Sequence, residues 1–318
     1  TIVSDKLDYA PSELVTLTGQ NWQGDTRVHI LVNDDYDDPW ILETDSEVDP
    51  YVQADGSIVF AFNLPSWFIA SYTVTATGIP SGRIATTTFT DAAPPSIENL
   101  FQCDPPSVFD PATYTCVSSG NTGWVTGNND GPLFEGDTVP YRTRFQNLIV
   151  GDTYSVLIGW DTTKASKHAL DYLKSFNATI TGADPCVSLT GLPAGLCSGA
   201  PSTFPIPPDT FMQSDANWIA NGAVQEPGAV TMYGGTITGL DPYIHPVSYV
   251  GDTSTKINIY FTANSTDIVL AWGGHIATRA DWGLLNSAVS ITGSPYHMHI
   301  DNWKDETNDK KLNVGVMD

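Results

Sequence analysis

Alternation of apolar and polar residues constrains the fold of this chain more than any other feature of its sequence. Short runs such as VHILV at 28–32 and YTVTAT at 72–77 are rich in branched and aromatic residues. Successive side chains of a strand point to opposite faces of a sheet, so a period of two predicts half-buried β-strands. Gly, Pro, Asn and Asp interrupt the runs about every ten residues, as in antiparallel sandwiches. The sequence therefore predicts an all-β protein.

A short proline-rich segment separates two regions with this pattern. We expect residues 1–91 to form an immunoglobulin-like β-sandwich, and Ala92-Ala93-Pro94-Pro95 to form a stiff linker. Residues 96–318 contain no comparable linker, so we expect a second, larger β-sandwich with long loops over 101–131 and 185–227. Its strands are expected at 139–145, 153–160, 176–181, 230–233, 256–263, 268–272 and 288–291.

One segment of the second region departs from the period of two. Leu170 and Leu173 stand three residues apart, and Ala169 and Leu173 four apart, within 163–176. These spacings place side chains on one face of a helix. We therefore expect a short helix lying across a sheet, or an irregular crossover.

The excess of acidic residues argues against two classes of partner. Lys and Arg number 13 and Asp and Glu number 36, which gives a formal net charge of −23. Nucleic acid and anionic lipid surfaces attract clustered Lys and Arg, so neither is an expected partner. No apolar run approaches the roughly 18–20 residues of a membrane helix, so we expect no membrane insertion. A surface of this charge favours cations.

Four cysteines, Cys103, Cys116, Cys186 and Cys197, indicate where the protein resides. Each neighbouring pair brackets a loop rich in Pro, Ser and Gly, so Cys103–Cys116 with Cys186–Cys197 is the simplest of the possible pairings. Zinc is the rival interpretation, although zinc-binding pairs are usually spaced as CxxC. Disulfides indicate an oxidising compartment, hence an extracellular or cell-surface protein.

Two glycosylation sequons fit the same location. Asn177 and Asn264 are each followed two residues later by Thr. A chain rich in Thr produces such matches by chance, so both asparagines are candidate sites only.

The longest run of carboxylates follows a predicted strand. Close carboxylates repel one another unless a hard cation neutralises them, and Ca²⁺ takes oxygen ligands from such loops. The spacing is not that of an EF-hand, and the alternative is a solvated acidic loop. No cofactor is required by the sequence, and Ca²⁺ is the one candidate. The candidate ligands are Asp34, Asp35, Asp37 and Asp38, with a weaker second cluster at Asp301, Asp305, Glu306 and Asp309.

Histidine spacing suggests a second metal hypothesis. His297 and His299 are two residues apart and share one face of a predicted strand. With His275 they would supply three zinc ligands. The alternative is that all three are hydrogen-bonded, structural histidines.

Tryptophan supplies a glycan hypothesis. Trp218 lies in a predicted loop rich in small residues, where an exposed indole could stack on a sugar. Trp160 and Trp272 end apolar strands and are expected in the core.

No catalytic constellation stands out. G-x-S-x-G and Gly-rich phosphate-loop motifs are absent. Arg279 and Asp281 flank one residue and are expected to form a structural ion pair. We expect no catalytic residues and do not expect an enzyme.

Both regions resemble parts of large secreted bacterial proteins with tandem immunoglobulin-like repeats. The resemblance implies a secreted, surface-associated or matrix-like protein, and it supplies no catalytic residue. In the first region the similar segments are SDKLDYAP (4–11), VTLTG (15–19), LPSWF (64–68) and SYTVTATG (71–78). In the second region, which resembles the domain that follows such repeats, they are EGDTVPYR (135–142), WDTTK (160–164), KHALDYL (167–173), YGGTITG (233–239), AWGGHIATR (271–279) and GSPYHM (293–298).

Together these features predict an extracellular structural protein, a cell-surface or filament subunit that self-associates through β-sandwich domains. The alternatives are a calcium-dependent or glycan-binding adhesin and, with less support, a hydrolase on a β scaffold. The amino-terminal residues Thr1, Ile2, Val3 and Ser4 are expected either to complete a neighbour's sheet or to form the first strand of their own domain.

Overall fold

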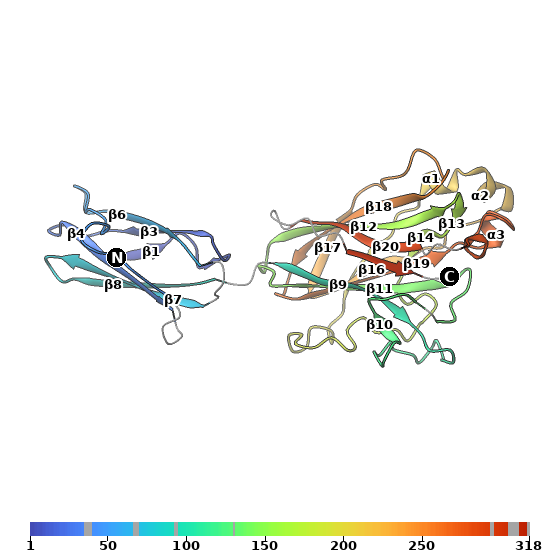
Figure 1. Cartoon of the computed structure of the whole chain (residues 1–318), viewed down its shortest axis with the longest axis horizontal. Coiled ribbons are helices and arrows are strands. Elements are labelled where there is room, and N and C mark those ends of the chain that lie inside the picture. The colour runs from blue at the N-terminus through green and yellow to red at the C-terminus, as the bar shows by residue number, and fades with distance from the viewer. Residues whose placement is uncertain are drawn as a thin grey trace. The chain divides into compact units, whose positions relative to one another are not determined.

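The structure is a computed structural model that divides into two compact units, Thr1–Pro94 and Pro95–Asp318 (Figure 1). The boundary falls in the proline-rich segment, of which residues 92–94 lie outside the described part of the chain. At 302, 304 and 312–316 the description covers the backbone alone. The described residues are 1–34, 40–65, 70–91, 95–129, 131–292, 296–304 and 312–316.

Unit 1 is a β-sandwich of a three-stranded sheet, ordered β1-β3-β6, and a five-stranded sheet, ordered β2-β8-β7-β4-β5. Alternation places Val28, Ile30 and Val32 of β4 in the core between the sheets. The strands are β1 (Ile2–Ser4), β2 (Asp8–Tyr9), β3 (Leu14–Gly19), β4 (Arg27–Asp34), β5 (Ile41–Glu43), β6 (Ile58–Asn63), β7 (Ser71–Ile79) and β8 (Ile84–Asp91).

Unit 2 is a larger sandwich. Its seven-stranded sheet has the order β10-β9-β11-β19-β16-β15, with β14 also paired to β19. Its six-stranded sheet has the order β17-β18-β12-β20-β21, with β13 paired to β12. The strands are β9 (Ser96–Asp104), β10 (Gly123–Val125), β11 (Thr138–Gln146), β12 (Thr153–Lys164), β13 (Lys167–His168), β14 (Leu170–Lys174), β15 (Ser202–Pro205), β16 (Ala229–Tyr233), β17 (Gly235–Leu240), β18 (Thr253–Ala263), β19 (Ile268–Ile276), β20 (Tyr296–Lys304) and β21 (Leu312–Val316).

Three short helices gather at one end of unit 2 (Figure 1). Asp209 and Asp215 cap the first two, because each carboxylate accepts a backbone N–H of the first turn. Thr278 caps the third through its hydroxyl. The helices are α1 (Thr210–Gln213), α2 (Ala216–Asn221) and α3 (Arg279–Trp282), followed by the 3₁₀ turn η1 (Ala288–Ser290).

The core of unit 2 lies between its two sheets and is rich in aromatic rings. Phe145 of β11 stacks on Trp303 of β20, with ring centroids 4.5 Å apart. Trp160 and Trp272 are fully buried, as the sequence predicts. Every residue of β19 is buried, so both faces of this strand are covered. The inner face packs in the core, and the outer face carries the features described below.

The all-β class is confirmed, but three local expectations, one helix and two strands, are wrong. Residues 163–176 form no helix but the irregular crossover given as the alternative: β12 continues to Lys164, β13 pairs with β12, and β14 pairs with β19 of the other sheet. Leu170 and Leu173 instead face Ile276 and Gly274 of β19, so strand pairing prevails over the helical spacing. Residues 176–181 form turns, and 288–290 form η1.

The amino-terminal residues form an edge strand of their own unit. Ile2, Val3 and Ser4 pair with Gly19, Thr18 and Leu17 of β3. The amino group of Thr1 donates to Gln20 O at 2.7 Å, and the Ile2 side chain is buried. Of the two roles expected for this segment, the structure shows the first strand of its own sandwich.

Replacing Phe145 by Ala should lower the free energy of unfolding of unit 2 by about 3–5 kcal/mol, because it leaves a cavity beside Trp303. Phe134→Ala is the matched control, since Phe134 is 70% exposed. Urea unfolding followed by tryptophan fluorescence measures both. Equal effects of the two variants would contradict this account of the core.

Candidate functional site

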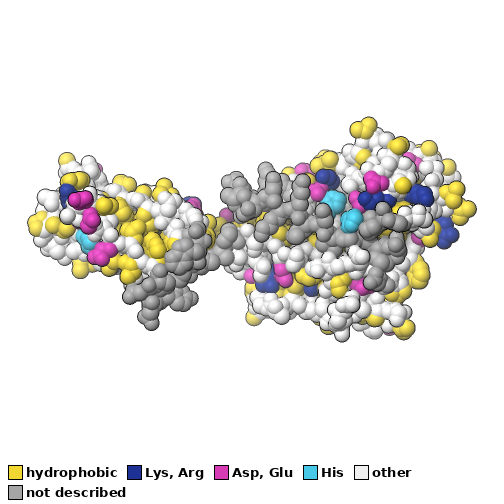
Figure 2. Space-filling model, viewed as in Figure 1, with side chains coloured by type: hydrophobic (Ala, Val, Ile, Leu, Met, Phe, Trp, Pro, Cys, Tyr) yellow, Lys and Arg dark blue, Asp and Glu magenta, His cyan; other side chains and the backbone are white. Residues whose placement is uncertain are grey.

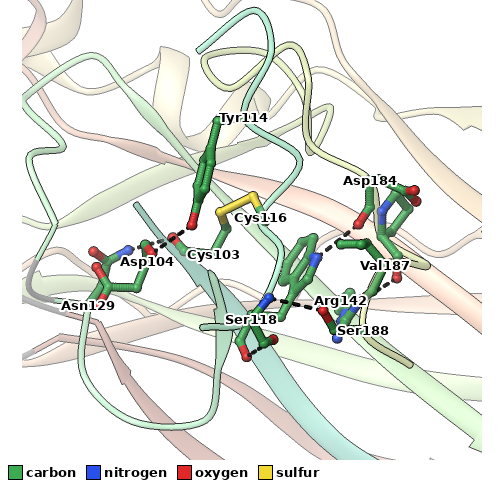
Figure 3. The surroundings of a disulfide bond; sticks show 12 residues. Cys103, Asp104, Tyr114, Cys116, Ser118, Asn129, Arg142, Asp184, Val187 and Ser188 are labelled. Atoms are coloured by element: carbon green, nitrogen blue, oxygen red, sulfur yellow. Dashed lines mark hydrogen bonds between the residues drawn. A yellow bond between two sulfur atoms is a disulfide. The ribbon is translucent and has the colours of Figure 1, made fainter. Parts of the chain in front are cut away.

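Two disulfide-bonded loops cover part of the outer face of the seven-stranded sheet. The structure joins Cys103 to Cys116 and Cys186 to Cys197, the neighbouring pairing expected from the sequence. No free cysteine occurs among the described residues. Figure 3 shows the first disulfide beside the second loop, whose Asp184 carbonyl accepts the Trp124 indole N–H at 2.9 Å. The backbone N–H of Asp184 also donates to Thr115 O of the first loop at 3.1 Å. The first loop is thus bound to the segment that leads into the second.

A buried cation joins this layer to the sheet. Arg142 of β11 is 2% exposed, and its Nη1 donates to Pro185 O at 2.9 Å and Val187 O at 2.6 Å (Figure 3). Its guanidinium lies 4.5 Å from the ring centroid of Trp124 and 5.1 Å from that of Phe101. Burial lowers the pKa of Arg142 to about 9, so the group is still charged at neutral pH.

Arg144, two residues along the same face of β11, repeats the arrangement. Its Nε donates to Asp267 Oδ1 at 2.8 Å, and its Nη1 donates to Thr190 O at 2.8 Å. Nη2 reaches Gly191 O at 3.2 Å. Two arginines of one strand therefore hold the carbonyls of the second disulfide loop against the sheet.

A hydrogen-bonded cluster lies between β14, β19 and α3. The Asp171 carboxylate is fully buried and contacts His275 Nδ1 at 2.7 Å through Oδ1. Its Oδ2 accepts the indole N–H of Trp282 at 2.9 Å. Tyr172 stacks on His275, and His168 stacks on Trp282, with ring centroids 4.3 Å and 3.3 Å apart. The segments 167–173 and 271–279, far apart in sequence, supply most of this cluster.

The pKa values of the two histidines of the cluster are shifted in opposite directions. Burial lowers the pKa of His168 to about 4, although Asp171 and Asp215 oppose that shift. Burial also disfavours the charged form of His275, but the charge of Asp171 and the hydrogen bond to it prevail and raise its pKa. The cluster thus pairs a neutral imidazole with one that retains its proton more strongly than usual.

Glu135 connects α3 and η1 to the loop before β11. Its Oε2 accepts Arg279 Nε at 3.0 Å, and its Oε1 accepts the backbone N–H of Val289 at 3.1 Å. Burial acts to raise the pKa of Glu135, but these hydrogen bonds prevail and lower it. The expected Arg279–Asp281 pair is wrong: Asp281 bonds to Thr278 at the start of α3, and Arg279 turns to Glu135.

The three histidines of the zinc hypothesis do not converge. His275 belongs to the seven-stranded sheet, whereas His297 and His299 belong to β20 of the other sheet. His297 Nδ1 contacts Asp161 at 3.1 Å and His299 Nε2 contacts Asp301 at 3.4 Å. Figure 2 shows histidine, acidic and basic side chains side by side on this face of unit 2. The described residues include no group of three His, Cys, Asp or Glu placed to hold a metal ion.

Most of the proposed calcium ligands lie outside the described residues. Asp34 ends β4, and its Oδ2 accepts the backbone N–H of Trp40 at 2.8 Å. In the second acidic cluster, Asp301 is the described member, and it contacts Lys256 at 2.5 Å. The proposed ligands outside the described part are Asp35, Asp37, Asp38, Asp305, Glu306 and Asp309.

The proposed sugar-stacking tryptophan is buried. Trp218 lies in α2, is 3% exposed and packs against Trp282 with ring centroids 5.1 Å apart. The small residues around Trp218 predicted a loop, but they form α2, which packs on the cluster around Asp171 through Trp218. The sequon residues Asn177 and Asn264 are both exposed.

Sequence patterns did not identify the residues that organise these features. Arg142 and Asp171 sit at positions that look like ordinary polar residues in strands or turns. Arg142 occurs in VPYRTRF, where alternation indicates only which residues face the core. One usable signal was present, because Arg142 and Arg144 are two of only five arginines in a strongly acidic chain.

Comparison with known proteins gives a weak similarity to solved structures. No family model and no curated protein matches this chain. Among the solved structures that match is a protein from Corynebacterium diphtheriae named as a proposed membrane-anchored protein, with 11% identity and a TM-score of 0.26. The match covers 99% of this chain and 56% of the other, so this chain spans about half of that protein. In the described part of this chain, no helix is long and apolar enough to cross a membrane.

Arg142→Lys should lower the free energy of unfolding of unit 2 by about 2–4 kcal/mol, since an ammonium cannot reproduce the planar guanidinium that lies over the rings of Trp124 and Phe101 while its Nη1 binds two carbonyls. It should also speed proteolysis within residues 185–197. Arg279→Lys is the control, because Arg279 is exposed and its ion pair contributes about 0–1 kcal/mol. Urea titration and timed proteolysis measure the two effects, and similar results for both variants would contradict the role of Arg142.

His168→Phe should stabilise the protein relative to wild type as the pH falls from 6.5 to 4. In that interval unfolded His168 takes up a proton and buried His168 does not, so the wild type loses up to about 3 kcal/mol. Phenylalanine retains the stacking on Trp282 but cannot be protonated. The difference in free energy of unfolding between variant and wild type, measured at each pH, should grow toward pH 4. A constant difference would refute this assignment.

Proposed function

We propose that this chain is an extracellular structural protein, a subunit of a cell-surface layer or filament, and not an enzyme. The observation that supports this most is the disulfide-bonded layer held on the outer face of unit 2 by Arg142 and Arg144. Both disulfides fit an oxidising, extracellular environment. Their effect is to immobilise surface loops, which suits a module that presents a fixed shape to its neighbours.

The use of the titratable groups supports a structural role. The carboxylates of Asp171 and Glu135 and the Nδ1 atom of His275 form hydrogen bonds with groups of the same unit. A general acid or base needs a substrate within hydrogen-bond reach. Asp171 is fully buried and its partners are core side chains, so a role in holding α3 on the sheet suits it better than catalysis.

Edge strands supply the proposed assembly contact. Since β1 pairs with β3, the amino-terminal segment would act as an edge that accepts a strand and not as a detached donor. β1 is the outermost strand of the order β1-β3-β6, and Val3 is 53% exposed. An open edge offers unpaired N–H and C=O groups to another chain. Successive contacts of this kind would build a filament unless they close into a ring.

The assembly proposal predicts that oxidised protein forms filaments at high concentration, visible by negative-stain electron microscopy and sedimentation velocity. Val3→Lys should shorten or abolish them, because a charge on an edge strand opposes strand addition. Val247→Lys is the matched control, since Val247 is fully exposed and lies outside the strands. A wild-type protein that stays monomeric throughout would overturn the filament role, and filaments unaffected by Val3→Lys would overturn the role of β1.

Removing the second disulfide with Cys186→Ser and Cys197→Ser should lower the free energy of unfolding of unit 2 by about 3 kcal/mol. The bridge closes a separation of 11 residues, and its loss frees that loop in the unfolded chain. The transition of unit 1, which has no cysteine, serves as the internal control. Urea unfolding resolves the two transitions. An unchanged unit 2 would show that Arg142 and Arg144 hold the loop without the covalent bond.

A further inference from the structure

Unit 2 contains a pocket of about 350 Å³ between the loop before β11 and the segment that carries α3 and η1. This volume is near the lower end of the range for small-molecule sites. The lining is mainly apolar, and neither the disulfide loops nor the Asp171 cluster contributes to it. The apolar lining residues on which the argument rests are Leu133, Val139, Ile276, Ala288, Val289 and Tyr296.

Hydrogen bonds fix the two walls of this pocket relative to each other. The backbone N–H of Gly136 donates to Ile276 O at 2.9 Å, and that of Ile276 donates to Asp137 O at 2.9 Å. On the other side, Glu135 Oε1 accepts the N–H of Val289 at 3.1 Å. The cavity is therefore formed before any ligand arrives, which reduces the cost of ordering on binding.

Arg279 provides the polar group of the pocket. Its Nε donates to Glu135, while Nη1 and Nη2 have no hydrogen-bond partner among the described residues. The side chain is 53% exposed, so its outer edge is open to a ligand. Glu135 is the reverse case: it is 16% exposed, and both its oxygens already accept hydrogen bonds. Of the two charged groups in the lining, the one that still offers hydrogen bonds to a ligand is thus the positively charged Arg279.

We propose that this pocket binds a small amphipathic carboxylate, with an apolar body among the apolar lining residues named above and the carboxylate on Nη1 and Nη2 of Arg279. The two parallel N–H groups match a carboxylate in a bidentate pair. A net charge of −23 repels anions at long range, so burial of the apolar body has to supply most of the affinity. The site would therefore favour long-chain carboxylates over short ones.

Isothermal titration calorimetry of the full chain with straight-chain carboxylates, from hexanoate to decanoate below their micelle concentrations, tests this proposal. The dissociation constant should fall about fourfold for each added methylene until the pocket is full. Arg279→Gln should weaken decanoate binding about tenfold and leave binding of decanol nearly unchanged. Ala288→Phe should abolish binding of both, because the larger side chain occupies the cavity.

The matched control for the filled pocket is Val247→Phe, which adds an aromatic ring at an exposed site away from the lining. Methyl chemical shifts of Ala288 and Val289 supply a second readout in the wild-type chain, which does not depend on the folding of any variant. These shifts should move with decanoate and saturate with the calorimetric constant. Absence of binding at millimolar decanoate, or binding that survives Ala288→Phe, would refute the site.

Discussion

The buried guanidinium of Arg142 imposes the constraint on which the outer layer of unit 2 depends. A charged group that leaves water needs hydrogen-bond acceptors in fixed positions, and β11 has none to spare because its own carbonyls pair with β9 and β19. The acceptors come from Pro185 and Val187, in a loop more than 40 residues further along the chain. That loop has to stay in place, and the Cys186–Cys197 disulfide limits its alternatives. The Cys186–Cys197 disulfide and the Arg142 guanidinium thus hold the same loop in place.

The same outer face is covered in two different ways. Loops rich in turns lie over the region of β9 and β11, and short helices lie over the region of β14 and the end of β19. Each cover is held by buried charged groups, Arg142 and Arg144 in the first and Asp171 in the second. In both, the charged groups bond across to segments distant in sequence. Removing one of these groups would leave its partners buried without acceptors or donors, which is costlier than losing a surface ion pair.

The sequence predicted the layers of the fold better than the contacts within them. Alternation in β4 and β7 follows from one simple rule, since side chains of these strands alternate between a solvent-facing side and a buried side. In β11 the first eight residues are all buried, so the rule does not hold there. The rule fails in 167–173 because Leu170, Asp171 and Leu173 are all buried, so neither face of β14 is exposed to solvent. It also fails for Arg142, which alternation assigns to solvent although loops cover it. Trp218 was likewise expected in an exposed loop, whereas it lies in α2 and is buried. When segments distant in sequence cover a side chain, the residues around it in the sequence carry no pattern that indicates its burial.

The two disulfides have a mechanical consequence for a chain held at both ends. Each bridge joins residues close in sequence, with separations of 13 and 11, and neither links one sheet to the other. Under tension the sheets can therefore be pulled apart while the two closed loops cannot lengthen. With about 3.4 Å of extension per residue, these loops withhold roughly 70 Å of contour length from the stretched chain. The fully stretched chain of oxidised unit 2 would thus have a shorter end-to-end distance than that of reduced unit 2.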